Sequence, residues 1–485
     1  MTTDHIDVFT RQTSPPIHRS TSSGAGGYSS MFVAVTGSFL AMLDTTVVNV
    51  SLHATAQQFG DIAGSHWILT AYMLALCTTM TGCAWLVERF GSKRVFAASL
   101  VGFLAGSLAC ALSPTLWFLI TARALTGMAA GVLTPVSTVL LTRGVPRERI
   151  GHVQSLQGSV SMIGPLVGPT IGGLLVSAAG WPAVYWINVP ACIVLLLVMR
   201  YVPSEIPEGG VHRLDLPGLA TGVLAILSCI VLCGMLGTLP LLHPLMLGIG
   251  LAAVTTGALF ILRELRTQKP LLNLRLYSNA IYGWSSINIA LLGFHLYAPM
   301  VIIPLYLQAA RGNDPIETGL ILSAGGIGVM AAGFTCPSIL RRFHGGHTMI
   351  AGIMITLIGS VPLVLVDEST SYEVLCAALV LRGVGTSLTV FAAMTRAFEA
   401  IPGGSIADAS SQLNLLQRLG GTLAAAVTLM AIRQGAAEHH GLTAQVFGTA
   451  SLWMLVATVI TLAPAAFLLR AERQQVRKEG TNRDR

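Results

Sequence analysis

The sequence predicts an all-α polytopic membrane protein, and three observations support this fold class. Of its 485 residues, 53% are apolar and only 10% are charged, whereas about a quarter of the residues in a soluble domain carry charge. Apolar runs of 18 or more residues recur along the chain, and each can cross a hydrocarbon core of roughly 30 Å as a helix. Lys and Arg gather in every second break between these runs, as expected of cytosolic loops.

The apolar runs number fourteen when they are divided at charged or Gly/Pro-rich breaks. If both termini lie on one side, 23 of the 28 Lys and Arg residues fall on that side, three lie within runs and two lie on the opposite side. This asymmetry predicts cytosolic termini and an even number of spans. The expected spans are 30–53, 67–87, 95–113, 116–141, 153–179, 183–200, 216–238, 244–262, 282–308, 318–340, 348–366, 372–395, 406–432 and 446–469.

A weak internal repeat predicts two related halves. Pro146 precedes Gly164 by 18 residues, and Pro402 precedes Gly420 by the same number. Secondary transporters build a central site from such duplicated halves. The seventh and eighth spans have no counterpart in this repeat and look inserted between two six-helix halves.

Five regions are therefore expected along the chain. The polar first region is interpreted as a disordered arm rather than a cleaved signal, because the apolar run after it is too long for a signal-peptide core. The regions are a cytosolic arm (1–29), an N-terminal six-helix half (30–200), a linker with two extra membrane helices (201–281), a C-terminal six-helix half (282–469) and a basic cytosolic tail (470–485).

The first span, MFVAVTGSFLAMLDTTVVNVSL, contains Asp44, the only one of the 21 acidic residues that lies near the middle of a span. An ionisable group at that depth costs at least a few kcal/mol and is a functional residue by default. At 1.5 Å per residue, Asp44 lies about 21 Å from the cytosolic end of its helix and Arg123 about 12 Å from the outer end of its own, so their depths nearly coincide. Burial favours the neutral acid and a nearby Arg favours the carboxylate. Asp44 and Arg123 are thus candidates for proton coupling, and a purely structural ion pair is the alternative.

The fifth span contains GPLVGPTIGG, in which three glycines repeat every four residues and share one helix face. Glycines let a neighbouring helix approach closely, and each proline removes a backbone donor and bends the helix. The pattern predicts a helix built to bend or rock, with the motif residues Gly164, Pro165, Gly168, Pro169, Gly172 and Gly173.

The second span ends in LVERFGSKRV, which is a candidate cytosolic gate. Glu88 and Arg89 can pair with a neighbouring helix, Gly91 turns the chain, and Lys93 and Arg94 add positive charge. A solvated positive-inside loop is the alternative interpretation.

Polar residues within the spans are the candidates for a substrate cavity between the halves. They are Thr45, Asn49, Asn288, Gln308, Asn414 and Arg418.

Several other functions are excluded by the sequence. The stretch Gly325–Ala331 mimics a dinucleotide fingerprint but lies in an apolar span and follows no strand, and neither GxxxxGK[ST] nor HExxH occurs. The eight cysteines lie in or at the ends of apolar runs without a CxxC pair, which indicates neither a metal site nor disulfides. The net charge of +7 reflects the positive-inside bias rather than nucleic-acid binding. We expect no enzyme activity and no cofactor other than a proton gradient.

These stretches together resemble the major facilitator superfamily, and within it the fourteen-span drug/proton antiporter family of multidrug and quaternary-ammonium exporters. LDTTVVNVSL, LVERFGSKR, RALTGMAAG and GPLVGPTIGG are similar to its motifs in the first span, second-span loop, fourth span and fifth span, and YWINVP and PLYLQ to other recurring stretches. Ala84, Glu88 and Ser92 depart from the usual loop motif, and VSLH places His53 near the outer mouth. The resemblance implies a major-facilitator fold of two six-helix halves plus two inserted helices.

The resemblance also implies proton-driven export of amphipathic drugs or toxic small molecules from the cytosol. The alternatives are a dedicated exporter of one endogenous metabolite or antibiotic, with Arg123 and Arg418 binding an anionic group, a nutrient uptake symporter, or a membrane sensor without transport. With a single buried acid, we expect neutral, monocationic or anionic substrates to be favoured over dications, unless Asp215, Glu317 or Asp408 reaches the cavity. The expected partners are the substrate, protons and the lipid bilayer of the plasma (inner) membrane, with the protein acting as a monomer.

Overall fold

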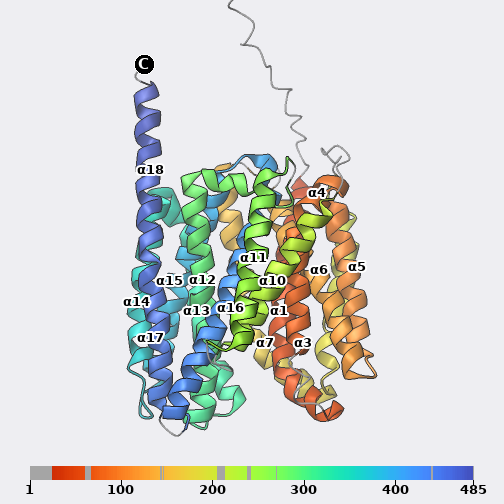
Figure 1. Ribbon diagram of the computed structural model, residues 1–485, viewed down its shortest axis with the longest axis vertical. Helices are drawn as coiled ribbons and strands as arrows, with labels where there is room; N and C mark the ends of the chain where they lie inside the picture. Colours follow the sequence, from red (N-terminus) through yellow and green to blue (C-terminus); the bar gives the residue numbers. More distant parts are fainter. Residues whose placement is uncertain are drawn as a thin grey trace, which may run out of the picture.

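Long helices packed side by side make up the protein, as the computed structural model shows (Figure 1). It describes residues 24–60, 67–142, 145, 147–204, 214–236, 242–268, 270–438 and 441–483. Within these residues eleven helices are long and apolar enough to cross a membrane, or twelve if the bent pair α3 (Trp67–Thr81) and α4 (Cys83–Phe90) is one span. This confirms an all-α multi-pass membrane protein.

The remaining helices follow the order of the apolar runs. They are α1 (Gly24–Phe59), α5 (Ser92–Ala111), α6 (Leu116–Thr142), α7 (Arg147–Ala179), α8 (Ala183–Trp186), α9 (Asn188–Met199), α10 (Leu216–Met235), α11 (Pro244–Arg266), α12 (Ala280–Leu305), α13 (Pro315–Arg342), α14 (Gly345–Val364), α15 (Tyr372–Glu399), α16 (Ile406–Glu438), α17 (Ala444–Ile460) and α18 (Leu462–Arg483). Short helical turns, η1 (Leu274–Ser278), η2 (Tyr306–Ala310) and η3 (Gly403–Ser405), join some of them.

The predicted count of fourteen spans is not confirmed. The expected fifth and sixth spans are helical as α7 and as α8 with α9, but the apolar stretches counted there, Thr170–Ala179 and Ala183–Met199, are shorter than a full span. The expected arm also ends earlier than predicted, because α1 begins at Gly24 and makes residues 24–29 helical. Residues 1–23 lie outside the described part of the chain.

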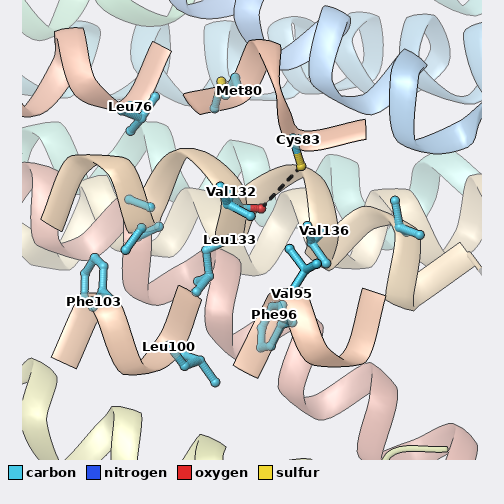
Figure 2. Packing of buried hydrophobic residues seen from close by; sticks show 14 of the residues in the cluster. Leu76, Met80, Cys83, Val95, Phe96, Leu100, Phe103, Val132, Leu133 and Val136 are labelled. Carbon is cyan, nitrogen blue, oxygen red and sulfur yellow. Dashed lines mark hydrogen bonds between the residues drawn. The ribbon is translucent and has the colours of Figure 1, made fainter. Parts of the chain in front are cut away.

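Close helix approach in the first half depends on glycines of α6. A side chain on Gly127 would run into the backbone carbonyl of Tyr72 in α3, and one on Gly131 into that of Leu76. The space around this contact is filled by the apolar side chains labelled in Figure 2, which come from α3 to α6 and include Phe96 and Leu133. The resulting core holds the first, second, third and fourth spans in fixed register.

The two halves repeat one packing arrangement. In the first half α7 packs along α1, with Gly164 against Leu43, and in the second half α16 packs along α12, with Gly420 against the carbonyl of Ala290. Gly164 and Gly420 are the two glycines that the internal repeat relates. The repeat therefore corresponds to equivalent helix contacts.

The inserted helices α10 and α11 form a pair on the outside of the bundle. Arg263 of α11 donates hydrogen bonds to both carboxylate oxygens of Asp215, which caps α10, at 2.6 to 3.2 Å. These bonds hold the pKa of Asp215 below its usual value. Helix α10 also contacts α3 and α16, one from each half. The pair thus lies where the two halves meet.

Candidate functional site

Asp44 and Arg123, predicted at the same depth, form an ion pair inside the first half. The Nη1 of Arg123 on α6 donates to Oδ2 of Asp44 on α1 at 2.8 Å, and both side chains are fully buried. Asp44 Oδ1 accepts a second hydrogen bond from Nδ2 of Asn188, the first residue of α9, at 2.9 Å. Both carboxylate oxygens therefore have charged or polar donors, which offset the cost of burying an ionised acid.

Side chains from three further helices, α5, α3 and α8, complete this centre. Asn188 also donates to Oγ of Ser107 on α5 at 3.2 Å, so that α1, α5, α6 and α9 meet at one set of polar groups. The Arg123 guanidinium carbon lies 4.1 Å from the ring centroid of Tyr72 and 5.8 Å from that of Tyr185. An aromatic face attracts a buried cation, most strongly where water is excluded.

The Asp44 centre is electrically neutral but incompletely bonded. Among the described residues, the Nε and Nη2 atoms of Arg123 and the Oδ1 atom of Asn188 have no hydrogen-bond partner. All three are buried and would gain from a water molecule or a small polar ligand.

The glycine motif of α7 contacts α1 directly beside Asp44. A Cβ on Gly164 would lie 3.0 Å from the Leu43 nitrogen and one on Gly172 would lie 3.0 Å from the Val47 carbonyl, while one on Gly168 would overlap Thr46. Gly173 faces open space. The three glycines at four-residue spacing therefore form a seam, here called the glycine seam, on which the Asp44 helix rests.

The prolines of the same motif are only partly described. Helix α7 continues through positions 165 and 169 to Ala179, but the side chains of Pro165 and Pro169 lie outside the described part, as does that of His53. The bend expected at these prolines stays a prediction.

The six residues predicted for a substrate cavity are not joined to one another by hydrogen bonds among the described side chains. Asn49 and Gln308 are exposed. Thr45 bonds to the Ala41 carbonyl and the Tyr72 hydroxyl, and Asn288 and Asn414 bond to carbonyls one turn earlier in their own helices.

Arg418, the sixth of these predicted cavity residues, differs from the others because its side chain contacts both halves. Its Nη2 lies 3.8 Å from Met42 Sδ on α1, and its Nη1 donates to Tyr297 Oη on α12 at 3.4 Å. It is 5% exposed, and no carboxylate among the described residues pairs with it. The three acids at span ends that were candidates to reach the cavity have other partners. Asp215 pairs with Arg263, Glu317 accepts from Asn313 near the start of α13, and Asp408 accepts from the Asn273 nitrogen.

The candidate gate motif forms the junction between α4 and α5. Gly91 adopts φ +81° there, Arg89 lies over the rings of Trp85 and Phe90 in its own helix, and Lys93 donates to the Val202 carbonyl. Arg94 and Glu88 are exposed. The expected pairing of Glu88 or Arg89 with a neighbouring helix is not found among the described residues, because Arg89 turns onto aromatic rings instead.

The sequence alone missed the partners of the ion pair. Tyr72, Ser107 and Asn188 carry no charge, and polar residues are common in membrane helices. Asn188 and Tyr185 do lie in the stretch YWINVP, whose polar residues within an otherwise apolar run were the available signal.

Comparison with known proteins agrees with this architecture. A sequence profile described as the Major Facilitator Superfamily matches residues 34–425. The chain is 30% identical over 438 residues to the Methylenomycin A resistance protein of Streptomyces coelicolor, which covers 87% of this chain and 91% of that protein. It is also 28% identical over 405 residues to the Multidrug resistance protein B homolog of Mycobacterium tuberculosis, and this match covers 81% of this chain and 74% of that protein. A crystal structure of the human organic anion transporter MFSD10 has the same fold, with a TM-score of 0.61 at 16% identity, covering 94% of this chain and all of that one.

Proposed function

The chain belongs to the Major Facilitator Superfamily, a family of transporters, and from this premise we propose that it is a proton-driven antiporter that exports amphipathic drugs or toxic small molecules from the cytosol. Its relatives include proteins named for multidrug and methylenomycin A resistance. The proposal places it in the plasma membrane with both termini in the cytosol, where the positive-inside bias favours them.

The observation that carries the proposal is the buried Asp44–Arg123 pair. Asp44 is the only acid in the middle of a predicted span, and it lies among four helices of one half, 1% exposed. A proton can reach it only when those helices move relative to one another. A carboxylate whose accessibility depends on conformation is suited to couple a proton gradient to transport.

The coupling follows from the contacts of the pair. In this conformation Arg123 and Asn188 occupy both carboxylate oxygens of Asp44. In the proposed cycle, Asp44 exchanges a proton with one side of the membrane when helix movement separates it from these donors. In this proposal the glycine seam allows the movement, because α1 can slide or rock on α7 where Gly164, Gly168 and Gly172 present no side chain to it.

A dedicated exporter of one anionic metabolite or antibiotic is the second candidate, and Arg418 favours it. Arg418 lies between α1 and α12 without a carboxylate, so an anionic group bound there would gain a charge-assisted hydrogen bond. Arg123 does not fit the role that this alternative gave it, since its charge is already balanced by Asp44.

Accumulation of a fluorescent dye in inverted membrane vesicles tests the proposal. We expect proton-driven uptake of ethidium into the vesicles, abolished by an uncoupler and absent from vesicles that lack the protein. Movement in the opposite direction would indicate an uptake symporter. An absence of any gradient-driven movement for ethidium and for anionic dyes alike would contradict transport and favour a sensor.

A further inference from the structure

The second half contains a buried polar centre at the place where the first half has Asp44. Its members are His295 on α12, Ser360 on α14, Arg382 on α15 and Thr458 on α17. These are the first, third, fourth and sixth helices of their half, as α1, α5, α6 and α9 are of theirs. His295 corresponds to Asp44 by helix, and Arg382 corresponds to Arg123.

Arg382 is a buried cation without a counter-ion. It is 3% exposed, and it donates to the Ser360 hydroxyl and, at 3.2 Å, to the backbone carbonyl of His295. Among the described residues no carboxylate lies within ion-pair distance of it. Neutral oxygens thus take the place that the carboxylate of Asp44 has in the first half.

The hydrogen bonds of Thr458 assign the tautomer of His295. Thr458 Oγ1 donates its one hydrogen to the Met454 carbonyl at 2.8 Å, so it can only accept from the imidazole, whose Nδ1 lies 3.1 Å away. Nδ1 therefore carries the hydrogen, and Nε2 carries a lone pair. This Nε2 is buried and has no partner among the described residues. A lone pair buried without a donor is a vacant proton-binding position.

From this geometry we propose that His295 Nε2 is a second proton-binding site of the transport cycle, in addition to Asp44. A proton adds to the Nε2 lone pair and later leaves from the same nitrogen, so no other bond forms or breaks. This inference rests on the proposed function of proton-coupled export. It makes two protons, rather than one, the number carried in each cycle.

The surroundings of the ring explain why the site is vacant in this conformation. The ring is buried, and burial disfavours a charged imidazolium. Helix α15 also brings Arg382, which donates to the His295 carbonyl, and a second positive charge near its guanidinium is unfavourable. Helix α17 brings only Thr458, and α16 brings Arg418, which contacts Tyr297 two residues further along α12. Among the described residues, Arg382 is the charged group that contacts His295. In this proposal His295 takes a proton in a conformation that opens the ring to water and moves Arg382 away from it.

In this proposal each half thus places a buried arginine beside a proton-binding side chain, which is an acid in the first half and a base in the second. Arg123 is paired with the carboxylate of Asp44, whereas Arg382 donates to the backbone of the residue that carries the proposed second proton site. Both arginines come from the fourth helix of their half. A single movement of these helices would open both sites to protons together.

The number of protons can be measured in proteoliposomes that contain the full chain. At zero membrane potential and a pH difference of about one unit, the ethidium gradient that stops net flux should be about 100-fold for two protons and about 10-fold for one. We expect the larger gradient for the wild type and the smaller one for His295→Asn, whose amide still donates to Thr458 but does not titrate. His243→Asn is the matched control, because His243 is an exposed helix cap that Asn can replace. Equal gradients for the wild type and His295→Asn would overturn the inference.

A second measurement separates this inference from the proposed function. If the wild type shows no proton-driven flux, the proposed function fails, and nitrogen NMR of labelled histidine in the full chain decides the site by itself. We expect a neutral Nδ1–H tautomer for His295 in the wild type, and protonation at higher pH in Arg382→Gln. An Nε2–H tautomer, or a titration that Arg382→Gln leaves unchanged, would overturn it.

Discussion

Each half buries one arginine on its fourth helix, but the positive charge of that arginine is balanced differently in the two halves. In the first half the charge of Arg123 is cancelled by Asp44, whereas in the second half the partners of Arg382 among the described residues are the Ser360 hydroxyl and a backbone carbonyl. Removing an ion from water costs several kcal/mol, whether or not a partner ion is present. The comparison teaches that the repeated helix packing specifies where a buried arginine lies, but not how its charge is balanced.

Removing the carboxylate from the first half should have the largest effect. We expect Asp44→Asn to abolish uncoupler-sensitive efflux, because Asn keeps the hydrogen-bond acceptor for Arg123 but cannot bind and release a proton. The protein should still insert, since the second half already holds an arginine without a carboxylate. Dye transport in inverted vesicles, at matched membrane levels of protein, measures this. Full uncoupler-sensitive transport by the variant would remove the functional distinction between the halves.

Bulk in the glycine seam should have the next largest effect. A side chain at Gly168 would overlap Thr46, two residues from Asp44, whereas one at Gly173 meets no atom within 4 Å. We expect Gly168→Leu to lower the transport rate by at least about tenfold, because close approach of small residues cannot accommodate four extra carbons. Gly173→Leu is the control and should transport at close to the wild-type rate. Equal rates for the two variants would mean that movement of α1 on α7 is not needed.

The uncompensated charge at Arg418 should set the preference among substrates. We expect a monocationic dye to compete better than a dicationic analogue of matched size. Arg418→Gln should improve the dication by about one order of magnitude, because one unit charge at roughly 10 Å and an effective dielectric of 20 is worth about 1.7 kcal/mol.

Two outcomes of this competition series are informative. Arg418→Lys keeps the charge and should keep the wild-type preference, which separates charge from shape. Stronger competition by the dication in the wild type would reveal an additional acid in the cavity and would make the two halves alike in charge compensation.

The inserted pair α10–α11 provides the smallest expected effect, because its ion pair is open to solvent. Arg263 is 40% exposed, and its hydrogen bonds lower the pKa of Asp215 below the usual 3.8. The ion pair therefore contributes its full stabilisation above that pH and loses it as the pH falls through the lowered pKa. We expect Asp215→Asn to lower the melting temperature slightly at neutral pH and not at about pH 2. An equal loss at both pH values would show that the loss does not come from the ion pair.

The sequence predicted the helices well where they are long and apolar. The expected runs 216–238 and 244–262 correspond to α10 and α11, and the run 116–141 corresponds to α6. A membrane helix must satisfy its own backbone hydrogen bonds, so the length of an apolar run predicts the length of the helix. The ends were less predictable, since α1 starts at Gly24 within the expected arm and α18 runs to Arg483 through the expected tail.

By itself the sequence determined the membrane class, the duplicated halves, the single mid-span acid and the depth at which Asp44 and Arg123 could meet. Helix length, charge asymmetry and the rise per residue are properties of a segment, so they can be obtained without knowing its neighbours. Only the tertiary structure decided which uncharged residues complete the site. Asn188, Ser107 and Tyr72 join the Asp44–Arg123 pair, and Thr458 assigns the tautomer of His295. These contacts depend on how each helix is rotated about its axis. The packing of neighbouring helices sets that rotation, so a single segment does not reveal it.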